Sequence, residues 1–237
     1  KIYSEQEALD IIIQVAQALE HAHAVGLIHR DVKPKNIMIT KDGVVKLADM
    51  GLARETADIE TAKLEAGKAY GTPYYIAPEQ IKGMVDVDGR ADIYSLGATF
   101  YHMLTGRVPF TGEDSAEIMR KHLKEPLIPP DHINTSLSAG VSEIIEVMMA
   151  KRREDRYANA KELLADLIAV RNGQPPLRAK RRFDVSAIEK LEQGTPVDEQ
   201  EEVVALAESL RLYRTATIAL GAVCALLLMV VVFLLAR

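Results

Sequence analysis

Four polar residues in a short stretch of the chain have the types and order that phosphoryl transfer requires. Asp31 supplies a carboxylate, Lys33 supplies a cation, and Asn36 and Asp49 supply two oxygen donors. Phosphoryl transfer needs a carboxylate facing the attacking hydroxyl, oxygen ligands for magnesium and a cation near the moving phosphoryl group. All of these groups occur within roughly twenty residues, so this stretch is the first candidate for a catalytic site.

These residues belong to three motifs that follow one another along the chain. The motifs are IHRDVKPKN at residues 28–36, ADMG at residues 48–51 and GTPYYIAPE at residues 71–79. In this order and spacing they resemble the catalytic loop, the metal-binding loop and the end of the activation segment of a protein kinase. The five fixed positions of the first motif would arise by accident on the order of once in ten thousand chains of this length, so the resemblance is specific.

The resemblance implies a role for each of these motif residues. Asp31 would accept or orient the proton of the substrate hydroxyl, and Lys33 would contact the γ-phosphate of ATP. Asn36 and Asp49 would bind Mg²⁺, for which amide and carboxylate oxygens are suitable hard ligands. Thr72 would close on Asp31 and Lys33. Lysine and threonine at these two positions are typical of the serine/threonine-specific members of the family.

The resemblance also implies supporting residues around the catalytic loop. Glu79 and Arg156 would form a buried ion pair between the activation segment and the late helices, and losing one partner would leave an uncompensated charge. Asp92 would hold backbone amides of the catalytic loop. His29 could serve as a general base because histidine titrates near neutrality, but it is a structural residue in the family, and we adopt that interpretation.

Two methionines occupy positions that have defined uses in the family. Met50 stands where the family usually has Phe, and its apolar, flexible side chain can fill the same hydrophobic slot. Met38 matches the residue that forms the floor beneath adenine, and would contact the nucleotide. A place in an ordinary strand core is the alternative interpretation of Met38.

Arg30, next to the candidate catalytic carboxylate, has an implied regulatory role. An arginine at this point in the family usually binds a phosphorylated activation loop through a charge-assisted pair, which orders the loop. The candidate phosphate acceptors in this chain are Thr56 and Thr61. We therefore expect activation by phosphorylation at these residues.

Local patterns predict the helices that position these motifs. Ser4 and Glu7 form a capping box at the start of an amphipathic helix over residues 4–25, which a glycine then ends. His21 and His23 on this helix have no metal-ligand partners, so we interpret them as surface or core residues. Further helices are predicted over residues 91–105, 114–124, 138–150 and 159–170.

A β-hairpin is predicted directly after the catalytic loop. The short runs 37–39 and 44–47 are rich in β-branched residues and are separated by Lys41-Asp42-Gly43, a hairpin signal. Such a hairpin would return the two expected magnesium ligands to one site. The polar stretch over residues 54–70 has no convincing periodicity and is interpreted as a mobile loop.

The last part of the chain is predicted to cross a membrane. Residues 217–236 carry no charge. A helix of twenty residues is about 30 Å long, the thickness of the hydrocarbon core of a bilayer. Arg211 and Arg214 flank this stretch on its N-terminal side, and positive residues prefer the cytoplasm. We expect a single-pass protein of the cell membrane with its kinase domain in the cytoplasm.

Three parts are predicted along the chain. Residues 1–171 carry the resemblance and would form a mainly α (α+β) domain with small β-hairpins, similar to the larger, C-terminal lobe of a kinase. Residues 172–214 would form a juxtamembrane linker with an amphipathic helix, and residues 215–237 a transmembrane helix. This order resembles that of bacterial membrane-anchored serine/threonine kinases.

The small lobe of the kinase fold is not recognised in the sequence. A Gly-rich phosphate loop, a strand lysine and a partner glutamate are missing, and the sequence begins at Lys1 in what resembles the first turn of a helix. We expect a fragment that binds nucleotide poorly by itself. At its other end the sequence stops one residue past the expected span, so it is either cut at both ends or tail-anchored.

Composition limits the classes of partner and compartment. The formal net charge of -5 gives no global attraction to nucleic acid. The single cysteine, Cys224, excludes an intrachain disulfide and fits a reducing compartment. Protein substrates and a membrane are the expected partners, and a homodimer would suit phosphorylation in trans.

Two functions of different classes fit these observations. The first is a serine/threonine protein kinase that uses ATP and Mg²⁺. The second is a membrane-tethered scaffold without activity. Retention of Asp31, Lys33, Asn36 and Asp49 together favours the kinase, because a scaffold has no physical need for a magnesium site. A lipid or small-molecule kinase is disfavoured by the complete GTPYYIAPE segment, which serves peptide substrates in the family.

Overall fold

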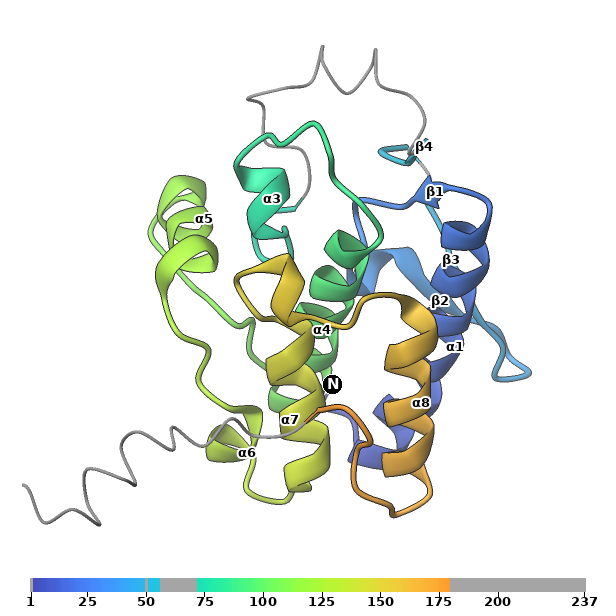
Figure 1. Ribbon diagram of the computed structural model, residues 1–237. Coiled ribbons are helices and arrows are strands. Elements are labelled where there is room, and N and C mark those ends of the chain that lie inside the picture. Colours follow the sequence, from blue (N-terminus) through green and yellow to red (C-terminus); the bar gives the residue numbers. More distant parts are fainter. Residues whose placement is uncertain (1, 50, 56–71, 180–237) are drawn as a thin grey trace, which may run out of the picture. The chain divides into compact units, whose positions relative to one another are not determined.

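The structure, a computed structural model, describes residues 2–49, 51–55 and 72–179 (Figure 1). Helices dominate, and the strands are short, so the predicted mainly α class with small hairpins is confirmed for these residues. The elements are α1 (Glu5–Ala24), β1 (Leu27–Ile28), η1 (Pro34–Asn36), β2 (Ile37–Ile39), β3 (Val45–Leu47), β4 (Arg54–Glu55), α3 (Pro78–Ile81), α4 (Arg90–Thr105), α5 (Ser115–Lys124), α6 (Pro130–Ile133), α7 (Ala139–Met148), η2 (Arg153–Asp155) and α8 (Ala160–Arg171).

Helix α1 begins and ends where its sequence predicts. The Ser4 hydroxyl accepts a hydrogen bond from the Glu7 amide at 3.3 Å, and the Glu7 carboxylate accepts one from the Ser4 amide at 2.9 Å. This reciprocal pairing satisfies two amides that have no partner inside the helix. After the helix, Gly26 has a φ of 79°, a left-handed conformation that glycine adopts without strain.

The other predicted helices are also present, with ends that differ by at most two residues. Asp114, Ser138 and Asn159 cap α5, α7 and α8, each accepting a hydrogen bond from the backbone amide three residues later. Gly106 ends α4 with a φ of 70°. These local signals are sufficient because a cap contacts only its own first turn.

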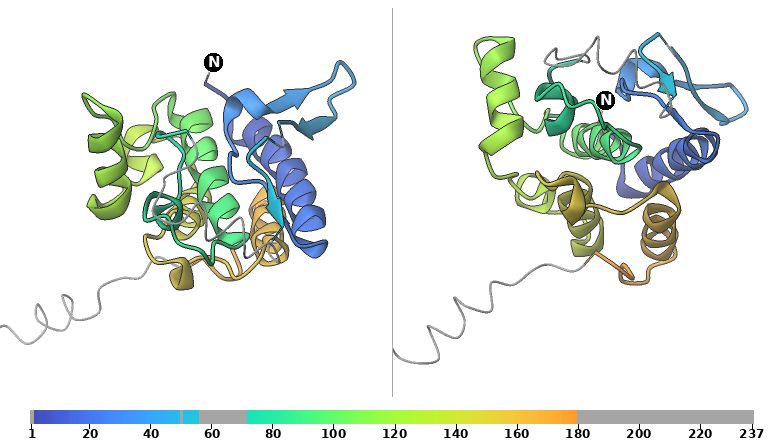
Figure 2. Two further views of the ribbon diagram at one scale, coloured as in Figure 1. Left: turned by 90° about the horizontal axis from the view of Figure 1, so that it is seen from above. Right: turned by 45° about the horizontal axis from the view of Figure 1, so that its top comes forward.

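Helix α4 is the centre of the domain, and nearly every residue along it is buried. It packs against α1 and α7, while α1 also packs against α8. A Cβ atom added at Gly97 would lie 2.8 Å from the Cβ of Met148, so the close approach of α4 and α7 requires glycine there. Helix α5 and the β2–β3 hairpin lie on opposite sides of α4 (Figures 1 and 2).

The predicted hairpin forms, and a second small sheet was not predicted. Strands β2 and β3 pair antiparallel, with Ile37 opposite Leu47 and Ile39 opposite Val45. Strands β1 and β4 also pair antiparallel. The prediction of a loop over residues 54–70 is therefore wrong for its first two residues, while residues 56–70 lie outside the described part of the chain. Two-residue strands leave no periodicity in a sequence, so only the fold reveals this pairing.

The predicted linker does not begin freely at residue 172. The carboxylate of Asp166, on α8 and fully buried, accepts hydrogen bonds from the amides of Leu177, Arg178 and Ala179 at 2.8–3.2 Å. The hydroxyl of Tyr157 donates to the same carboxylate at 2.8 Å. Residues 177–179 thus belong to the domain rather than to a solvated linker.

The predicted membrane span cannot be compared with this structure. In the part of the chain that the structure describes, no helix is both long and apolar enough to cross a bilayer. The stretch 217–236 and the amphipathic helix expected before it lie outside the described residues.

Candidate active site

The backbone of the catalytic loop is fixed by one buried carboxylate at the start of α4. Asp92 accepts hydrogen bonds from the amide of His29 at 2.9 Å and from the amide of Arg30 at 2.7 Å. Arg30 has a φ of 68°, which is unfavourable for a residue with a side chain. The two hydrogen bonds that Asp92 accepts help to hold this conformation immediately before Asp31.

Asp92 has a further partner that the sequence did not indicate. His23, on α1, binds the Oδ2 atom of Asp92 through its Nε2 atom at 2.8 Å. Our interpretation of His23 as an ordinary surface or core residue is therefore incomplete, because it braces the carboxylate that holds the loop. A Cβ atom at Gly89 would lie 2.6 Å from the His23 ring, so glycine there makes room for the contact. No local pattern signals a contact between residues 69 positions apart.

His29 uses both ring nitrogens inside the protein. Its Nδ1 atom lies 3.3 Å from the Asp31 amide, which donates to it, and its Nε2 atom lies 3.1 Å from the carbonyl oxygen of Ala48. An accepting Nδ1 leaves the proton on Nε2, which can then donate to that carbonyl. His29 thus joins the catalytic loop to the loop that carries Asp49, and neither ring nitrogen is left for a substrate.

Asp31, Lys33 and Thr72 meet in a closed triangle of hydrogen bonds. The Lys33 ammonium lies 2.6 Å from Oδ2 of Asp31 and 2.9 Å from the hydroxyl oxygen of Thr72. The Thr72 hydroxyl donates to Oδ1 of Asp31 at 3.0 Å. The side chains of Lys33 and Asp31 are 19% and 9% exposed, so the triangle is partly desolvated but still accessible.

Asn36 is oriented by Asp31, and its oxygen is left available. Its Nδ2 atom donates to the carbonyl oxygen of Asp31 at 2.9 Å and lies 3.4 Å from Oδ2 of the same residue. The backbone amide of Ala48 donates to the backbone carbonyl oxygen of Asn36 at 2.8 Å, which extends the β2–β3 pairing by one residue pair. The hairpin therefore places Ala48, the residue before Asp49, beside Asn36.

Asp49 follows Ala48 with a φ of 66° and an exposed side chain, whose Oδ1 atom accepts a hydrogen bond from the Gly51 amide at 3.2 Å. An amide oxygen from Asn36 and a carboxylate from Asp49 are the hard donors that Mg²⁺ prefers. Magnesium also keeps several water or phosphate ligands, so two protein donors are enough. The residues present thus fit the expected ion.

The remaining predicted residues are placed as follows. Met38 is 59% exposed, so the alternative interpretation as strand core is wrong, and its side chain is open to a ligand. Arg30 is buried, and its carbonyl oxygen accepts a hydrogen bond from Gln80 at 2.8 Å. Met50, Thr56 and Thr61 lie outside the described residues.

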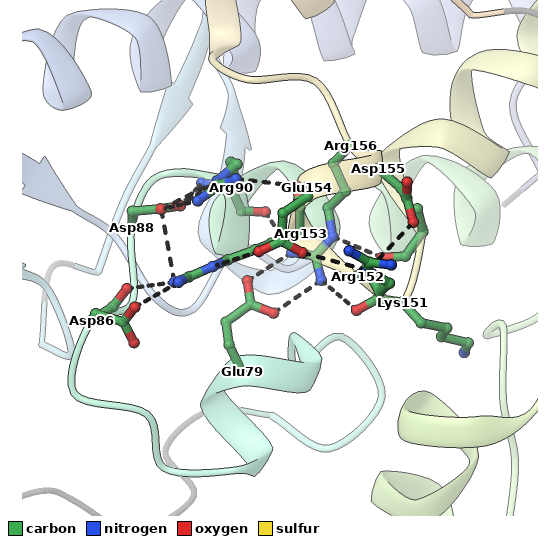
Figure 3. Close-up of polar contacts among 11 residues, drawn as sticks. Glu79, Asp86, Asp88, Arg90, Lys151, Arg152, Arg153, Glu154, Asp155 and Arg156 are labelled. Atoms are coloured by element: carbon green, nitrogen blue, oxygen red, sulfur yellow. Dashed lines mark hydrogen bonds and ion pairs between the residues drawn. The ribbon is translucent and has the colours of Figure 1, made fainter.

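Glu79 and Arg156 form a buried bidentate ion pair, drawn in Figure 3. The two nitrogen–oxygen distances are 2.7 and 2.9 Å. The other donors of Arg156 bind three backbone carbonyls, those of Ala150, Arg90 and Lys151. All five N–H groups of the guanidinium are therefore satisfied, which is the condition for a buried charge to be tolerated.

The Glu79–Arg156 ion pair is connected to the catalytic loop through Gln80, the residue that follows Glu79. Gln80 follows Glu79 on α3, donates to the Arg30 carbonyl and accepts from the Ala77 amide at 3.2 Å. No motif or local pattern in the sequence points to Gln80. Its role follows only from the way in which α3 packs beside residues 30–31.

Comparison with known proteins gives an independent view of these residues. A family model described as "Protein kinase domain" matches residues 1–167. The serine/threonine-protein kinase PknB of Mycobacterium tuberculosis is 42% identical over 171 residues, covering 72% of this chain and 27% of that protein. A probable serine/threonine-protein kinase PknB of Bifidobacterium longum is 40% identical over 176 residues, covering 74% and 25%. The chain spans about a quarter of the length of the curated relatives it matches.

Proposed function

The chain belongs to the protein kinase family, and we propose that it is the larger lobe of a serine/threonine kinase that transfers the γ-phosphate of ATP to proteins. The observation that carries this proposal is the triangle of Asp31, Lys33 and Thr72. A carboxylate held by a cation and a hydroxyl, beside an oriented asparagine, is the arrangement that phosphoryl transfer to a hydroxyl requires.

The proposed reaction divides the work among the residues of the triangle. Asp31 accepts the proton of the substrate hydroxyl, whose oxygen bonds to the γ-phosphorus of ATP as the bond to the leaving ADP oxygen breaks. Lys33 uses two of its three N–H donors on Asp31 and Thr72, which leaves one for the γ-phosphate. Asn36 and Asp49 would hold Mg²⁺, which neutralises phosphate charge when bound.

A nucleotide clamp completes the proposal. Kinase chemistry also uses a Gly-rich loop and a strand lysine around the phosphates. We expect a small lobe elsewhere in the full gene product to supply them, and the chain of residues 1–237 to have little activity alone. The exposed Met38 would then face the adenine.

Location and regulation extend the same proposal. The uncharged stretch 217–236 would anchor the protein in the cell membrane, with residues 1–179 as the cytoplasmic kinase domain and residues 180–214 as the linker. Phosphorylation of Thr56 or Thr61, in trans within a homodimer, would supply an anion for Arg30. Wild-type activity of a Thr56→Ala/Thr61→Ala double variant of the full-length protein would contradict this regulation.

Phosphoryl transfer by the full gene product tests the proposal. The protein is incubated with ATP, Mg²⁺ and a generic protein substrate, and phosphoserine and phosphothreonine are quantified. We expect Asp31→Asn to lower the rate constant about 10²- to 10⁴-fold, as for loss of a general base. The matched control is Asp42→Asn in the exposed hairpin turn, which should retain full activity. No transfer by the unmodified full-length protein would favour the scaffold instead.

A further inference from the structure

A pocket on the side of the domain near α3 is not used by the proposed reaction. It has a volume of about 340 Å³, within the range of ligand sites. Its walls come from three parts of the chain: α3 with the residues after it, the end of α5, and η2 with the turn before it. The lining residues are Pro78, Glu79, Lys82, Met84, Leu123, Lys151, Arg152, Arg153 and Glu154.

The acidic residues of this pocket are already neutralised. Glu79 is bound by Arg156 in the buried ion pair described above. Glu154 accepts a hydrogen bond from Arg153 at 3.3 Å. Arg153 in turn binds Asp86 at 2.5 Å, outside the pocket lining, and the network of these side chains is visible in Figure 3.

Two basic side chains of the pocket, Lys82 and Lys151, have no carboxylate partner in the described part of the chain, and a third, Arg152, forms only long ion pairs. Among the described residues, no carboxylate lies within 4.0 Å of the ammonium nitrogen of Lys82 or of Lys151. Arg152 is 76% exposed and lies 3.8–4.0 Å from Glu154 and Asp155, too far for a hydrogen bond. The pocket therefore has an excess of positive charge.

Lys151 is the most informative of the three, because its charge is partly buried and no carboxylate of the described residues lies within ion-pair distance, although the charge of Glu125 acts on it. Its ammonium donates to the carbonyls of Lys121 and His122 at 3.3 and 2.9 Å and lies 4.1 Å from the centre of the Phe110 ring. Burial lowers its pKa to about 8. Two of its three N–H groups are used, so one remains for a ligand. Figure 3 shows the side chain pointing away from the ion-pair network.

The position of the pocket suggests the kind of anion. Pro78 follows Thr72 by six residues, which span at most about 20 Å even when extended. The edge of the pocket at Pro78 therefore lies no more than about 20 Å from Thr72, a distance that about six residues of an extended substrate peptide can span. Protein substrates are the substrates of the proposed kinase, so the inference rests on that proposal.

We propose that this pocket binds a phosphorylated side chain of a protein substrate, so that the kinase prefers substrates already phosphorylated near the target hydroxyl. The phosphate oxygens would accept hydrogen bonds from the free N–H of Lys151 and from Lys82 and Arg152. Such charge-assisted bonds from three cations are the usual means of recognising a phosphate group.

Binding without ATP tests the pocket independently of catalysis. Full-length protein carrying Asp31→Asn is titrated with a phosphoserine peptide, with the same peptide unphosphorylated, and with inorganic phosphate. The phosphopeptide should bind at least about tenfold more tightly than the unphosphorylated one, as expected for hydrogen bonds to a charged group. The variant Lys82→Glu should remove this difference, and Lys151→Met should reduce it. Lys161→Met, an exposed position on α8, is the control and should leave it unchanged.

Kinetics of the otherwise unmodified full-length enzyme separate the two proposals. Lys82→Glu should raise KM for the phosphorylated peptide about tenfold, with kcat and the KM for the unphosphorylated peptide unchanged. Phosphopeptide binding without phosphoryl transfer would overturn the proposed function and leave the pocket intact. Transfer that is indifferent to prior phosphorylation would overturn the pocket alone. Equal binding of inorganic phosphate and phosphopeptide, or a phosphopeptide affinity that survives Lys82→Glu, would also overturn it.

Discussion

Two carboxylate–cation pairs of this domain have similar lengths and different surroundings. Asp31 and Lys33 approach to 2.6 Å, and Glu79 and Arg156 approach to 2.7 Å. Every N–H group of Arg156 has a partner inside the protein, whereas Lys33 retains a free donor at an accessible site. A pair with unused bonding capacity can engage a substrate, and a saturated buried pair can only support the fold.

We therefore expect the Asp31–Lys33 pair to matter mainly for activity and the Glu79–Arg156 pair mainly for stability. Breaking the Glu79–Arg156 pair leaves a buried charge without its counter-charge, which is costly. Breaking the Asp31–Lys33 pair costs less, because the Thr72 hydroxyl still donates to Asp31. Substitutions in the two pairs should therefore have opposite profiles, and the following variants are ordered by the size of the expected effect.

The largest effect is expected for Glu79→Gln. It leaves the buried guanidinium of Arg156 without its carboxylate, so the free energy of unfolding should fall by about 3–5 kcal/mol. Urea denaturation of the full chain measures the change. Glu113→Gln, in an exposed loop, should change it by less than about 0.5 kcal/mol. A loss below about 1 kcal/mol for Glu79→Gln would show that the two pairs do not differ as described.

Lys33→Met should show the opposite profile. Removing a preorganised donor for the phosphate should lower kcat of the full-length enzyme about 100-fold, with a loss of stability below about 2 kcal/mol. The matched control is Lys35→Met, an exposed lysine two residues later in the same motif. If Lys33→Met unfolded the protein, or if Lys35→Met were equally inactive, the comparison would fail.

The free energy of unfolding should also depend on pH through His122, a buried histidine. His122 is fully buried against Tyr94, whose hydroxyl lies 2.8 Å from Nδ1 of the ring. Burial, with a smaller contribution from Lys151, lowers its pKa from 6.5 to about 4. His122 binds a proton more readily in the unfolded chain than in the folded one. The contribution of neutral His122 to stability is therefore fully present above pH 6.5 and is lost as the pH falls toward 4. We expect a loss of about 2 kcal/mol between pH 7 and pH 5.

Denaturation curves at pH 7 and pH 5 measure this loss. His122→Asn has no ionisable group and can still bond to Tyr94, so its stability should change less between the two values. An identical pH dependence in the variant would assign the effect to other groups.

The smallest effect is expected for Thr72→Ala. Loss of one hydrogen bond to a carboxylate that Lys33 still holds should lower kcat about tenfold. Thr72→Ser keeps the hydroxyl and should stay within about threefold of the wild type. Equal losses in the two variants would mean that the methyl group, rather than the hydroxyl, matters.

Local features of this fold were predictable, and long-range contacts were not. Ser4 and Glu7 predict the start of α1 because a capping box is complete within four residues. The sequence motifs around Asp31, Asn36 and Asp49 are specific enough to predict these residues as a catalytic site. The hairpin signal between β2 and β3 predicts that Asn36 and Asp49 lie near each other.

Contacts between distant residues escaped prediction for a physical reason. The pairing of His23 with Asp92 and the binding of residues 177–179 by Asp166 join elements whose packing is set by the whole core. Neither leaves a local pattern. The composition of residues 172–179 is typical of a linker. These residues differ from a free linker because the amides of residues 177–179 donate hydrogen bonds to Asp166.

The most direct test of the proposed magnesium and phosphate site is a crystal structure of the full-length protein with Mg²⁺ and a non-hydrolysable ATP analogue. We expect the Asn36 side-chain oxygen and a carboxylate oxygen of Asp49 to lie about 2.0–2.1 Å from magnesium at the phosphates, with Asp31 facing the γ-phosphate. A nucleotide bound elsewhere, or a magnesium ion that neither residue contacts, would contradict it.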